Sequence, residues 1–398
     1  MTVKEQINTQ AADLPQSTET SFETAQVITI SFGHAIHDTY SAFLAPLLPE
    51  LIQRFALSNA LAGLLSAFLQ LPSIFQPLIG YLADRVSLRY LVILGPGVTA
   101  TAMSLIGVAP VYMLIAILLT VAGFASAGLH AVGPVMAGRV SGQRLGRGMS
   151  YWMVGGELGR TIGPIIIVSV VGWYGLGGSW WLMFGGWTAS IVLYLRLRGI
   201  SGRPVNPNDG MPWRDALRRM RPFLVALALL QVVRSFSSVA LTTYLPLFLK
   251  QQGASLWWAG ASLSFLEAAG VIGALVGGSI SDRIGRRLVI VIALSATSIL
   301  ILLFLVLQGS LRILLLPALG FFSLSTTPVI MAIAQECYPE NRAMANGAYM
   351  ALTFIIRSMV LVAFGVVSDV IGMPLTYLLS AFLLLLGLPI VRWFPKMA

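Results

Sequence analysis

The chain has few charged residues, few histidines and almost no cysteine. Only 10% of its 398 residues are charged, three are histidine, and one, Cys337, is cysteine. Soluble globular domains carry roughly 25% charged residues, which excludes a soluble enzyme. A single cysteine cannot form an internal disulfide, which excludes a disulfide-rich secreted domain. The sequence also contains no metal-ligand spacing, Walker loop or nucleophile triad, so we expect no enzymatic activity, metal or cofactor.

Long apolar runs dominate the chain instead, with 57% hydrophobic residues and a mean hydropathy of +0.84. The runs are unbroken and do not alternate with polar residues, so they predict helices rather than barrel strands. A membrane helix needs about 20 apolar residues, and twelve would use roughly 240. We predict an all-α membrane protein with twelve transmembrane helices, at 26–51, 58–82, 89–109, 111–137, 149–171, 178–197, 221–249, 256–280, 288–308, 311–334, 345–367 and 373–393.

The spans divide into two six-helix halves, 26–197 and 221–398, joined by a linker over 198–220. The linker region is rich in proline and arginine, as expected of a connection between domains. Within it, Trp213–Met220 is a candidate for a short helix on the membrane surface. Residues 1–25 are polar and lack the charged start and apolar core of a signal peptide, so we expect a cytoplasmic tail.

The positive charges fall mostly on one side of the predicted membrane. Nineteen of the 25 Lys and Arg residues lie in the tail, the linker and the even-numbered connections, and three lie on the other side. By the positive-inside rule, both termini are cytoplasmic in a multi-pass protein of the cell (inner or plasma) membrane. The net charge of +10 is therefore a topology signal, and we expect lipid as a partner rather than nucleic acid.

An internal repeat relates the two halves. Five residues of the first half recur 197 or 198 positions later: Ser58, Ala62, Gly63, Asp84 and Arg85 correspond to Ser255, Ala259, Gly260, Asp282 and Arg283. Two equivalent six-helix halves are the plan of a transporter that rocks around a site near the membrane midplane.

Each half also carries a Gly-x-x-x-Asp-Arg motif at the end of its second span. Glycine permits a sharp turn and a close approach of helices. Aspartate can accept backbone N–H groups at a helix start, and the arginines can pair with it and hold the cytoplasmic side shut. The residues predicted to form this cytoplasmic gate are Gly80, Asp84, Arg85, Arg89, Gly278, Asp282, Arg283 and Arg286.

With two such motifs at the repeat spacing, the chain resembles the major facilitator superfamily over nearly all of residues 26–394. The first copy departs from the family pattern at Ser87 and Leu88, where Gly and Arg are usual. The resemblance implies the major facilitator fold, transport of a small molecule by alternating access, and a monomer. It also implies that spans 3, 6, 9 and 12, which carry no mid-depth charge, lie at the periphery.

Three shorter segments narrow this resemblance. Gly159–Pro164 looks like the motif of antiporter branches, in which Gly159 and Gly163 let helices touch and Pro164 kinks the span. His34–Asp38 and Gly128–His130 resemble the fosmidomycin resistance branch, which implies antibiotic resistance through drug efflux by a drug:proton antiporter. This sequence differs from that branch at Ala131, where Pro is usual, and at His37, where Asn is usual.

Ionisable residues lie inside six of the predicted spans, where a charge costs about 2.5–3.5 kcal/mol unless it is paired or hydrated. His34 and Asp38 are four residues apart and share a helix face, and Glu157 and Arg160 are three apart and can pair. For Glu267, partners are available only on other helices, with Arg234 and Arg357 as candidates. We predict proton coupling by Asp38, His34, His37 and Glu267, and substrate binding by His130, Arg234, Arg357, Glu157 and Arg160.

Three hypotheses are compatible with these residues. The first is proton-coupled efflux of small toxic or drug-like compounds. The second is an uptake permease for an organic anion or nutrient, with Arg160, Arg234 and Arg357 as an anion clamp. The third is a non-transporting sensor of the same fold, which the many charges inside the spans disfavour. The Glu157–Arg160 pair also has a purely structural interpretation, as an ion pair that fixes helix packing.

Overall fold

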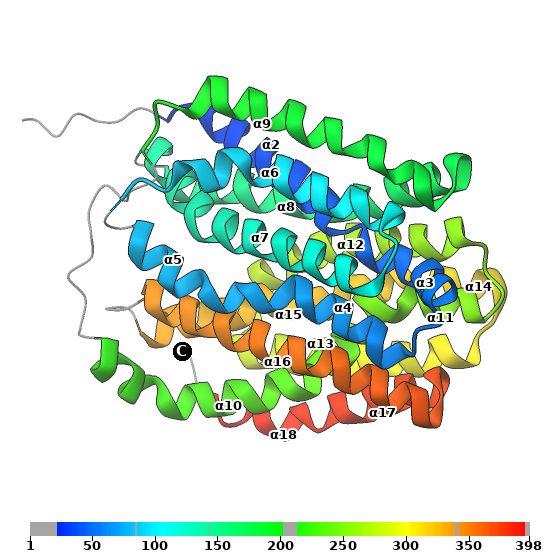
Figure 1. The fold of residues 1–398 in the computed structure, drawn as a ribbon. Helices are drawn as coiled ribbons and strands as arrows, with labels where there is room; N and C mark the ends of the chain where they lie inside the picture. The colour runs from blue at the N-terminus through cyan, green and yellow to red at the C-terminus, as the bar shows by residue number, and fades with distance from the viewer. Residues whose placement is uncertain (1–21, 84–85, 143, 202–212, 339–341, 395–398) are drawn as a thin grey trace, which may run out of the picture.

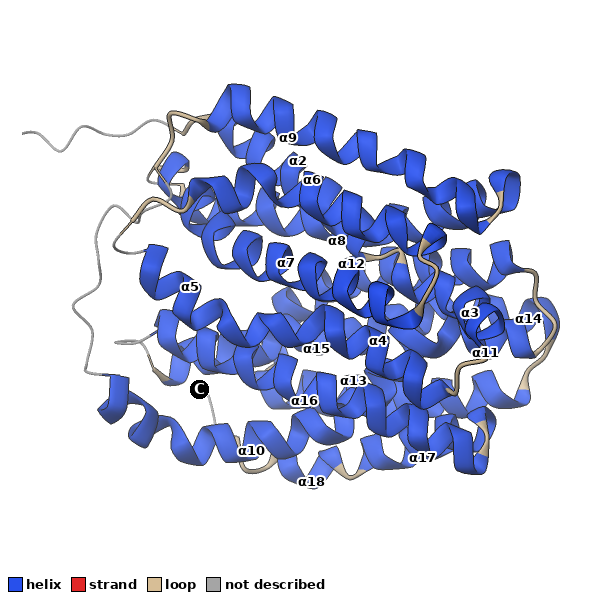
Figure 2. Cartoon of the chain, viewed as in Figure 1, coloured by secondary structure: helices blue, strands red, loops and turns tan. Residues whose placement is uncertain are grey.

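A computed structural model describes residues 22–83, 86–142, 144–201, 213–338 and 342–394. These residues form helices joined by short turns and contain no strand (Figures 1 and 2). The first set comprises α2 (Thr24–Ser41), α3 (Leu44–Phe55), α4 (Asn59–Gln70), η1 (Leu71–Phe75), α5 (Gln76–Ala83), α6 (Arg89–Leu105), η2 (Ile106–Val108), α7 (Tyr112–Val140), α8 (Leu145–Tyr174), η3 (Leu176–Leu182) and α9 (Met183–Leu197).

The second set repeats this pattern of long helices. It comprises α10 (Trp213–Val239), the π-helical segment η4 (Ala240–Tyr244), α11 (Leu245–Gln251), α12 (Leu256–Ile284), α13 (Arg286–Val306), α14 (Gly309–Leu314), α15 (Leu316–Cys337), α16 (Arg342–Ile371), α17 (Met373–Leu385) and α18 (Gly387–Val391). The all-α prediction is therefore confirmed.

Ten helices of the described chain are long and apolar enough to cross a membrane. The predicted spans 26–51 and 178–197 are not among them. The first is divided, because α2 ends at Ser41 and α3 begins at Leu44. In the second, the regular helix α9 is only 15 residues long and follows the 3-10 segment η3. The count of twelve spans stays a prediction.

The start of the second set differs from the predicted boundary at residue 221. Helix α10 begins at Trp213 and runs unbroken to Val239, so Trp213–Met220 extends the long helix instead of forming a separate one. The first turn is polar and carries Asp215, and a negative charge there interacts favourably with the helix dipole. Hydropathy located the apolar part of this helix but not its polar first turns. Residues 1–21 of the predicted tail and 202–212 of the predicted linker lie outside the described residues.

Both termini of the described chain lie at the same end of the helical bundle, which we call the terminal end (Figure 1). At the opposite end, which we call the far end, lie α3, α11, α14 and α17. Helix α9 runs along one edge of the bundle and α17–α18 along the opposite edge. The two sets of helices meet through α4 packed on α16 and α8 packed on α12.

At the far end the two sets are packed backbone to backbone. A side chain at Gly63 on α4 would overlap the Leu361 carbonyl oxygen of α16, and one at Gly365 would overlap the Asn59 carbonyl oxygen. The Tyr244 hydroxyl lies 2.9 Å from the carbonyl oxygens of Asn59 and Leu361, to which it donates. The far end is therefore closed by contacts that only glycine permits.

A carboxylate from one set also caps a helix of the other set. The backbone N–H groups of Asn59 and Ala60, at the start of α4, donate to Asp369 of α16 over 2.8 and 2.9 Å. Free N–H groups and the positive end of the helix dipole make a helix start a favourable place for a carboxylate. Asp369 thus adds a polar contact to the glycine packing between the sets.

Each set of helices has one buried apolar cluster toward the terminal end and one toward the far end, with a polar layer between them. Along α2, Val27 and Ile30 belong to a cluster at the terminal end, and Tyr40 and Phe43 belong to one at the far end. The ionisable residues of α2 lie between these two clusters. Along α10 the same arrangement places Arg234 between an apolar cluster around Leu227 and another around Val239.

Candidate functional site

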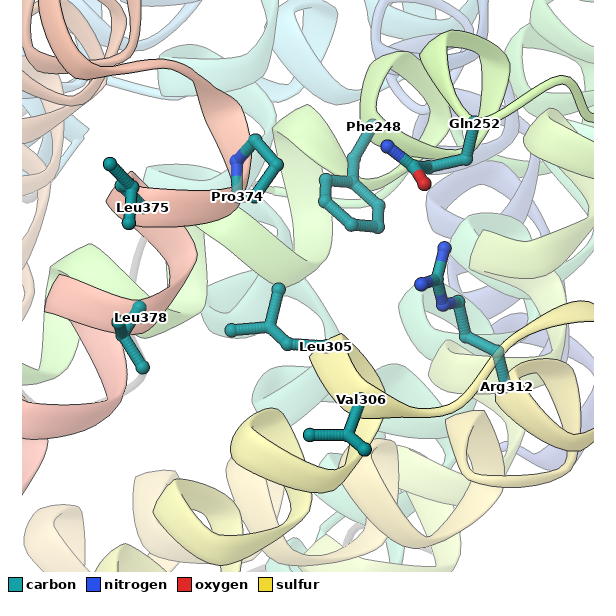
Figure 3. Close-up of a pocket in the computed structure, with 8 residues that line it drawn as sticks. All are labelled: Phe248, Gln252, Leu305, Val306, Arg312, Pro374, Leu375 and Leu378. Carbon is teal, nitrogen blue, oxygen red and sulfur yellow. The ribbon is translucent and has the colours of Figure 1, made fainter.

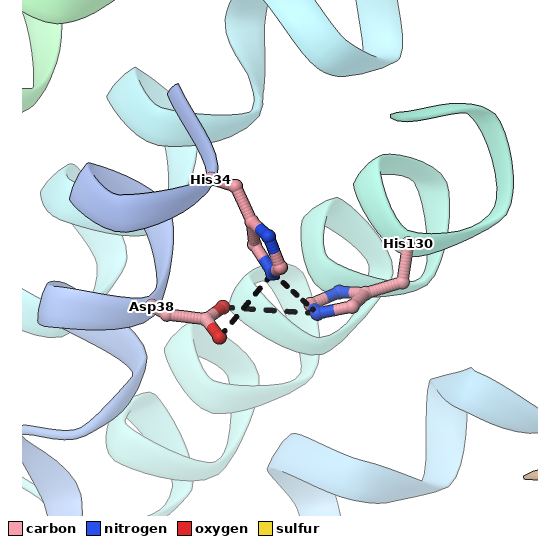
Figure 4. Close-up of side chains that lie close together, drawn as sticks. All are labelled: His34, Asp38 and His130. Atoms are coloured by element: carbon pink, nitrogen blue, oxygen red, sulfur yellow. Dashed lines mark hydrogen bonds and ion pairs between the residues drawn. The ribbon is translucent and has the colours of Figure 1, made fainter. Parts of the chain in front are cut away.

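His34, Asp38 and His130 form a close cluster, which we call the His–Asp cluster (Figure 4). His34 Nε2 lies 3.2 Å from His130 Nε2 and 3.4 Å from Asp38 Oδ2. His130 Nε2 lies 3.7 Å from Asp38 Oδ1. The prediction that His34 and Asp38 share a face of one helix is confirmed. His130, which we predicted to contact substrate, reaches the same cluster from α7.

Backbone carbonyls fix which nitrogen of each ring carries a hydrogen. His34 Nδ1 lies 2.9 Å from the Trp152 carbonyl oxygen, and His130 Nδ1 lies 2.9 Å from the Ser126 carbonyl oxygen. Because a carbonyl only accepts, each Nδ1 donates, and each Nε2 of a neutral ring has a lone pair. With both rings neutral, two lone pairs and a carboxylate therefore face one another, and a proton or a metal cation bound between them would relieve their repulsion.

The third histidine of the chain lies behind the cluster. The ring of His37 is fully buried, with Nδ1 3.0 Å from the Thr99 hydroxyl and Nε2 3.4 Å from the Ser41 hydroxyl. Its ring centroid lies 5.7 Å from that of His130. His37, which we also predicted to couple protons, therefore adjoins the His–Asp cluster through the edge of its ring but does not share the close contacts of the cluster.

Arg160 of α8 links three carboxylates from three helices. It forms an ion pair with Glu157, as its spacing predicted, and its Nη1 lies 4.0 Å from Asp38 Oδ2 on α2. Its Nε lies 3.7 Å from Glu267 Oε2 on α12 of the second set. The Arg160 side chain is 40% exposed, although its Nε atom is buried. The ion-pair partner of Glu267 is thus Arg160, not Arg234 or Arg357; sequence spacing carries no signal for a contact between the two sets.

Arg357 of the second set is held by hydroxyl groups. It donates to Ser238 over 2.8 Å and to Thr242 and Thr243 over 2.7 and 3.4 Å. Thr242 and Thr243 belong to the π-helical segment η4, a type of distortion that is frequent at functional sites.

Arg234 on α10 is held in a similar way. It donates to the Gln231 amide oxygen over 3.1 Å and to the Thr327 hydroxyl over 2.6 Å. Within the part of the chain that the structure describes, neither Arg234 nor Arg357 forms an ion pair with a carboxylate. Neither guanidinium charge is thus neutralised by a carboxylate within ion-pair distance in the described residues.

Glycines of α8 bring the site residues together. Side chains at Gly159 and Gly163 would overlap the backbone carbonyls of Ala35 and Thr39 on α2, so these glycines permit α8 to touch α2. These contacts are those expected of the predicted packing role, which stays a prediction. Pro164 lies inside α8, which continues as one helix from Leu145 to Tyr174. The kink predicted at this proline stays a prediction.

The predicted gate residues of the second set form an ion-pair group at the terminal end. Arg286 Nη2 lies 2.6 Å from Asp282 Oδ1 and 2.6 Å from Glu336 Oε1 at the end of α15. Glu336 was not predicted, because it lies 50 residues from Arg286 with no motif around it. Gly278 also lies on α12, with Pro328 of α15 3.9 Å from the place of a side chain, and Arg283 is exposed.

The first copy of the gate is only partly described. Asp84 and Arg85 lie outside the described residues. A side chain at Gly80 would meet no atom of the described chain within 4 Å, and the Arg89 guanidinium lies over the ring of Tyr90. In the described part of the chain, Gly80 and Arg89 thus show no contact between the two sets of helices, in contrast to the tight packing around Gly63 at the far end.

A separate pocket of about 250 Å³ lies at the far end of the second set (Figure 3). Its polar side chains are Gln252 and Arg312, and the others are apolar: Phe248, Leu305, Val306, Pro374, Leu375 and Leu378. Arg312 Nε donates to the Phe304 and Leu307 carbonyls, and its guanidinium lies over the rings of Phe248 and Phe304. None of the predicted site residues lines this pocket.

Comparisons with known proteins agree with this architecture. The family model of the Major Facilitator Superfamily matches residues 30–319 and 268–397. The fosmidomycin resistance protein of Escherichia coli is 27% identical over 370 residues, which is 90% of each chain. An uncharacterized MFS-type transporter of Bacillus subtilis, YfnC, is 24% identical over 373 residues, which is 91% of each chain.

Solved structures show the same fold at low sequence identity. A bacterial homolog of the human lysosomal transporter Spinster, in an inward-facing and unoccupied conformation, superposes with a TM-score of 0.76. It is 13% identical, with 94% of this chain and 98% of that chain covered. A D-xylose–proton symporter superposes with a TM-score of 0.74 at 16% identity, with 94% and 99% covered.

Proposed function

The chain belongs to the Major Facilitator Superfamily, and from this premise we propose that it exports small toxic or drug-like compounds in exchange for protons. Membership makes it a multi-pass membrane transporter of a small molecule rather than an enzyme. The finer proposal is supported by its similarity to the fosmidomycin resistance protein and by the charged residues of the site. The driving force would be the proton gradient, since one proton crossing with the field is worth about 2.3 kcal/mol per 100 mV.

The observation that carries the proposal is the bridge from the His–Asp cluster through Arg160 to Glu267. Asp38 belongs to the first set of helices and Glu267 to the second, so Arg160 interacts with carboxylates on both. A proton that binds the cluster removes negative charge next to Arg160 and changes its attraction to Asp38 relative to Glu267. Proton binding and the contact between the sets are then coupled, as alternating access requires.

We place both termini and the terminal end in the cytoplasm, and the protein as a monomer in the lipid of the cell membrane. The backbone contacts around Gly63 then close the outer side, and the site opens to the cytoplasm. The rocking units would be the two halves 26–197 and 221–398. The gate residues at the terminal end, with Arg286 and Asp282 among them, would close when the transporter turns outward.

The experiment that tests this function measures protons released from everted vesicles with an imposed pH gradient. A pH-sensitive dye reports the release while a panel of drug-like compounds is added. We expect at least one compound to release protons from vesicles that contain the protein and not from vesicles without it. If no compound does so, and an organic anion instead accumulates in the direction of uptake, the permease hypothesis replaces export.

The two arginines without carboxylate partners predict an anionic group on the substrate. In Arg357→Gln the hydrogen bonds to Ser238 and Thr242 are available to the amide, but the positive charge is lost. A charge-assisted hydrogen bond is worth about 1.5–3 kcal/mol, so we expect the KM for an anionic substrate to rise by about 10- to 150-fold. Arg312→Gln, which changes an arginine in the separate pocket, is the matched control. Equal KM values for Arg357→Gln and the unmodified protein would contradict this role.

A further inference from the structure

We propose that His34, Asp38 and His130 form a binding site for a divalent transition metal ion, with Zn²⁺ as the best fit. The proposal concerns the ligand of the His–Asp cluster in the resting protein. It does not rest on the proposed transport function, because metal binding can be measured without substrate or gradient. The sequence predicted no metal, because the three ligands come from two different helices and show no metal-ligand spacing along the chain. The structure brings them together, and the proposal therefore differs from that prediction.

The distances between the three ligand groups match a tetrahedral zinc site. Zn²⁺ binds histidine nitrogen and carboxylate oxygen at about 2.0–2.2 Å, and tetrahedral angles then place the ligand atoms about 3.3–3.6 Å apart. Within the cluster, His34 Nε2 lies 3.2 Å from His130 Nε2 and 3.4 Å from Asp38 Oδ2, and His130 Nε2 lies 3.7 Å from the other carboxylate oxygen, Oδ1. A rotation of the carboxylate with small shifts of the rings would bring one of its oxygens and both nitrogens to bonding distance of one ion.

The hydrogen bonds behind the cluster are those of metal-binding histidines. Such histidines almost always donate the hydrogen of their second nitrogen to a carbonyl or carboxylate, which orients the ring toward the metal. His34 and His130 both do this, to the carbonyls of Trp152 and Ser126. The Trp152 ring stacks on the His34 ring at 3.8 Å and restricts its rotation.

Charge balance also favours a divalent ion. Asp38, Glu157 and Glu267 carry three negative charges when ionised, and Arg160 carries one positive charge among them. With neutral histidines these four residues have a net charge of −2, and Arg357, which interacts electrostatically with Glu267, offsets part of it. The negative charge that remains favours a bound cation. His34 and Asp38 on α2 are buried away from water. Because an uncompensated charge is unfavourable in a buried place, binding of a cation there is favourable.

The cluster packs closely against α8 and is partly exposed at His130. A side chain at Gly156 would lie 2.7 Å from His34 Nε2 and 3.0 Å from Asp38 Oδ2, so glycine at this position permits the cluster to form beside the α8 backbone. The His34 and Asp38 side chains are nearly fully buried, whereas the His130 side chain is 25% exposed. An ion would therefore enter past His130, and the fourth position would be left for water or for an anionic ligand.

Two imidazoles and one carboxylate select among cations. Imidazole suits zinc, copper and nickel, whereas Mg²⁺ and Ca²⁺ prefer oxygen ligands. We therefore expect Zn²⁺ to bind and Mg²⁺ not to compete at the same concentration. A bound Zn²⁺ would occupy the atoms that a coupling proton needs, so it would also inhibit proton-coupled transport.

Calorimetric titration of Zn²⁺ into the full chain, purified without a histidine tag, tests the proposal. We expect one Zn²⁺ per chain, and a loss of affinity of at least about tenfold in His130→Ala, because losing a ligand costs no less than losing a supporting hydrogen bond. His37→Gln is the matched control, since His37 adjoins the cluster but contacts Thr99 and Ser41 instead. We expect this variant to bind Zn²⁺ as the unmodified chain does.

X-ray absorption at the zinc edge provides a second measurement that does not depend on folding of a variant. We expect two imidazole nitrogens and a carboxylate oxygen at about 2.0–2.2 Å around the bound metal. The proposal is overturned if the unmodified chain binds no Zn²⁺, if His130→Ala and His34→Ala both keep its full affinity, or if the spectrum lacks imidazole. None of these results bears on export, which the vesicle assay tests separately.

Discussion

Vesicles that contain Asp38→Asn should fail to build a substrate gradient from an imposed proton gradient. Asparagine nearly matches aspartate in size but cannot ionise, so the His–Asp cluster loses its negative charge and Arg160 loses one of its three carboxylates. One proton moving through 100 mV supplies about 2.3 kcal/mol, which sustains a concentration ratio of about 50. We expect this ratio to fall to one, because the proton no longer moves with the substrate.

The measurement is substrate accumulation in vesicles at a fixed pH gradient, with and without an uncoupler. Glu50→Gln is the matched control, because it also removes one carboxylate from the first set but lies on α3, away from the cluster. We expect Glu50→Gln to accumulate substrate normally. If Asp38→Asn reached the membrane and still accumulated substrate in an uncoupler-sensitive manner, Asp38 would not be the proton carrier.

Contacts within one helix were accessible from the sequence, and the structure contains them. His34 and Asp38 are four residues apart, Glu157 and Arg160 are three apart, and helical geometry places such pairs on one face. The spans were also largely predictable, because lipid requires long apolar helices whose backbone groups are paired internally. Local geometry and hydropathy thus account for the correct part of the prediction.

Contacts between distant helices were not accessible in this way. His130 lies 96 residues from His34, and its side chain was assigned to substrate because nothing in the spacing places it beside Asp38. The Arg160–Glu267 contact joins the two sets of helices, so it depends on their relative orientation. This orientation changes when a transporter with two such halves rocks between its states. Glu336 and the capping role of Asp369 were missed because each of these residues contacts a helix that is distant in the sequence, Glu336 within the second set and Asp369 between the sets.

The closed far end leads to a second prediction with a large effect, at Gly63. Any side chain at this position would overlap the Leu361 carbonyl oxygen and the Tyr244 hydroxyl, and a backbone carbonyl cannot move aside without separating α4 from α16. Overpacking in a well-packed interior costs about 1–3 kcal/mol, and it would act only in the state in which the far end is closed. Gly63→Val should therefore stabilise the opposite state and reduce transport to background.

Spin labels at the far end measure this shift directly. Val111 in the first set and Val306 in the second are exposed, so cysteines there can be labelled in a Cys337→Ser background. We expect a longer distance between the labels in Gly63→Val than in the parent. Gly172→Val is the matched control, because a side chain at Gly172 would meet no atom of the described chain within 4 Å.

A variant on the other side of the same contact separates loss of closure from loss of folding. At Gly365 on α16 even an alanine Cβ would overlap the Asn59 carbonyl oxygen on α4, so Gly365→Ala should lengthen the label distance in the same way. Two variants on different helices would then give one conformational change. An unchanged distance in both, with transport retained, would mean that the far end need not close as tightly as these glycines allow, and alternating access would have to rely on contacts elsewhere.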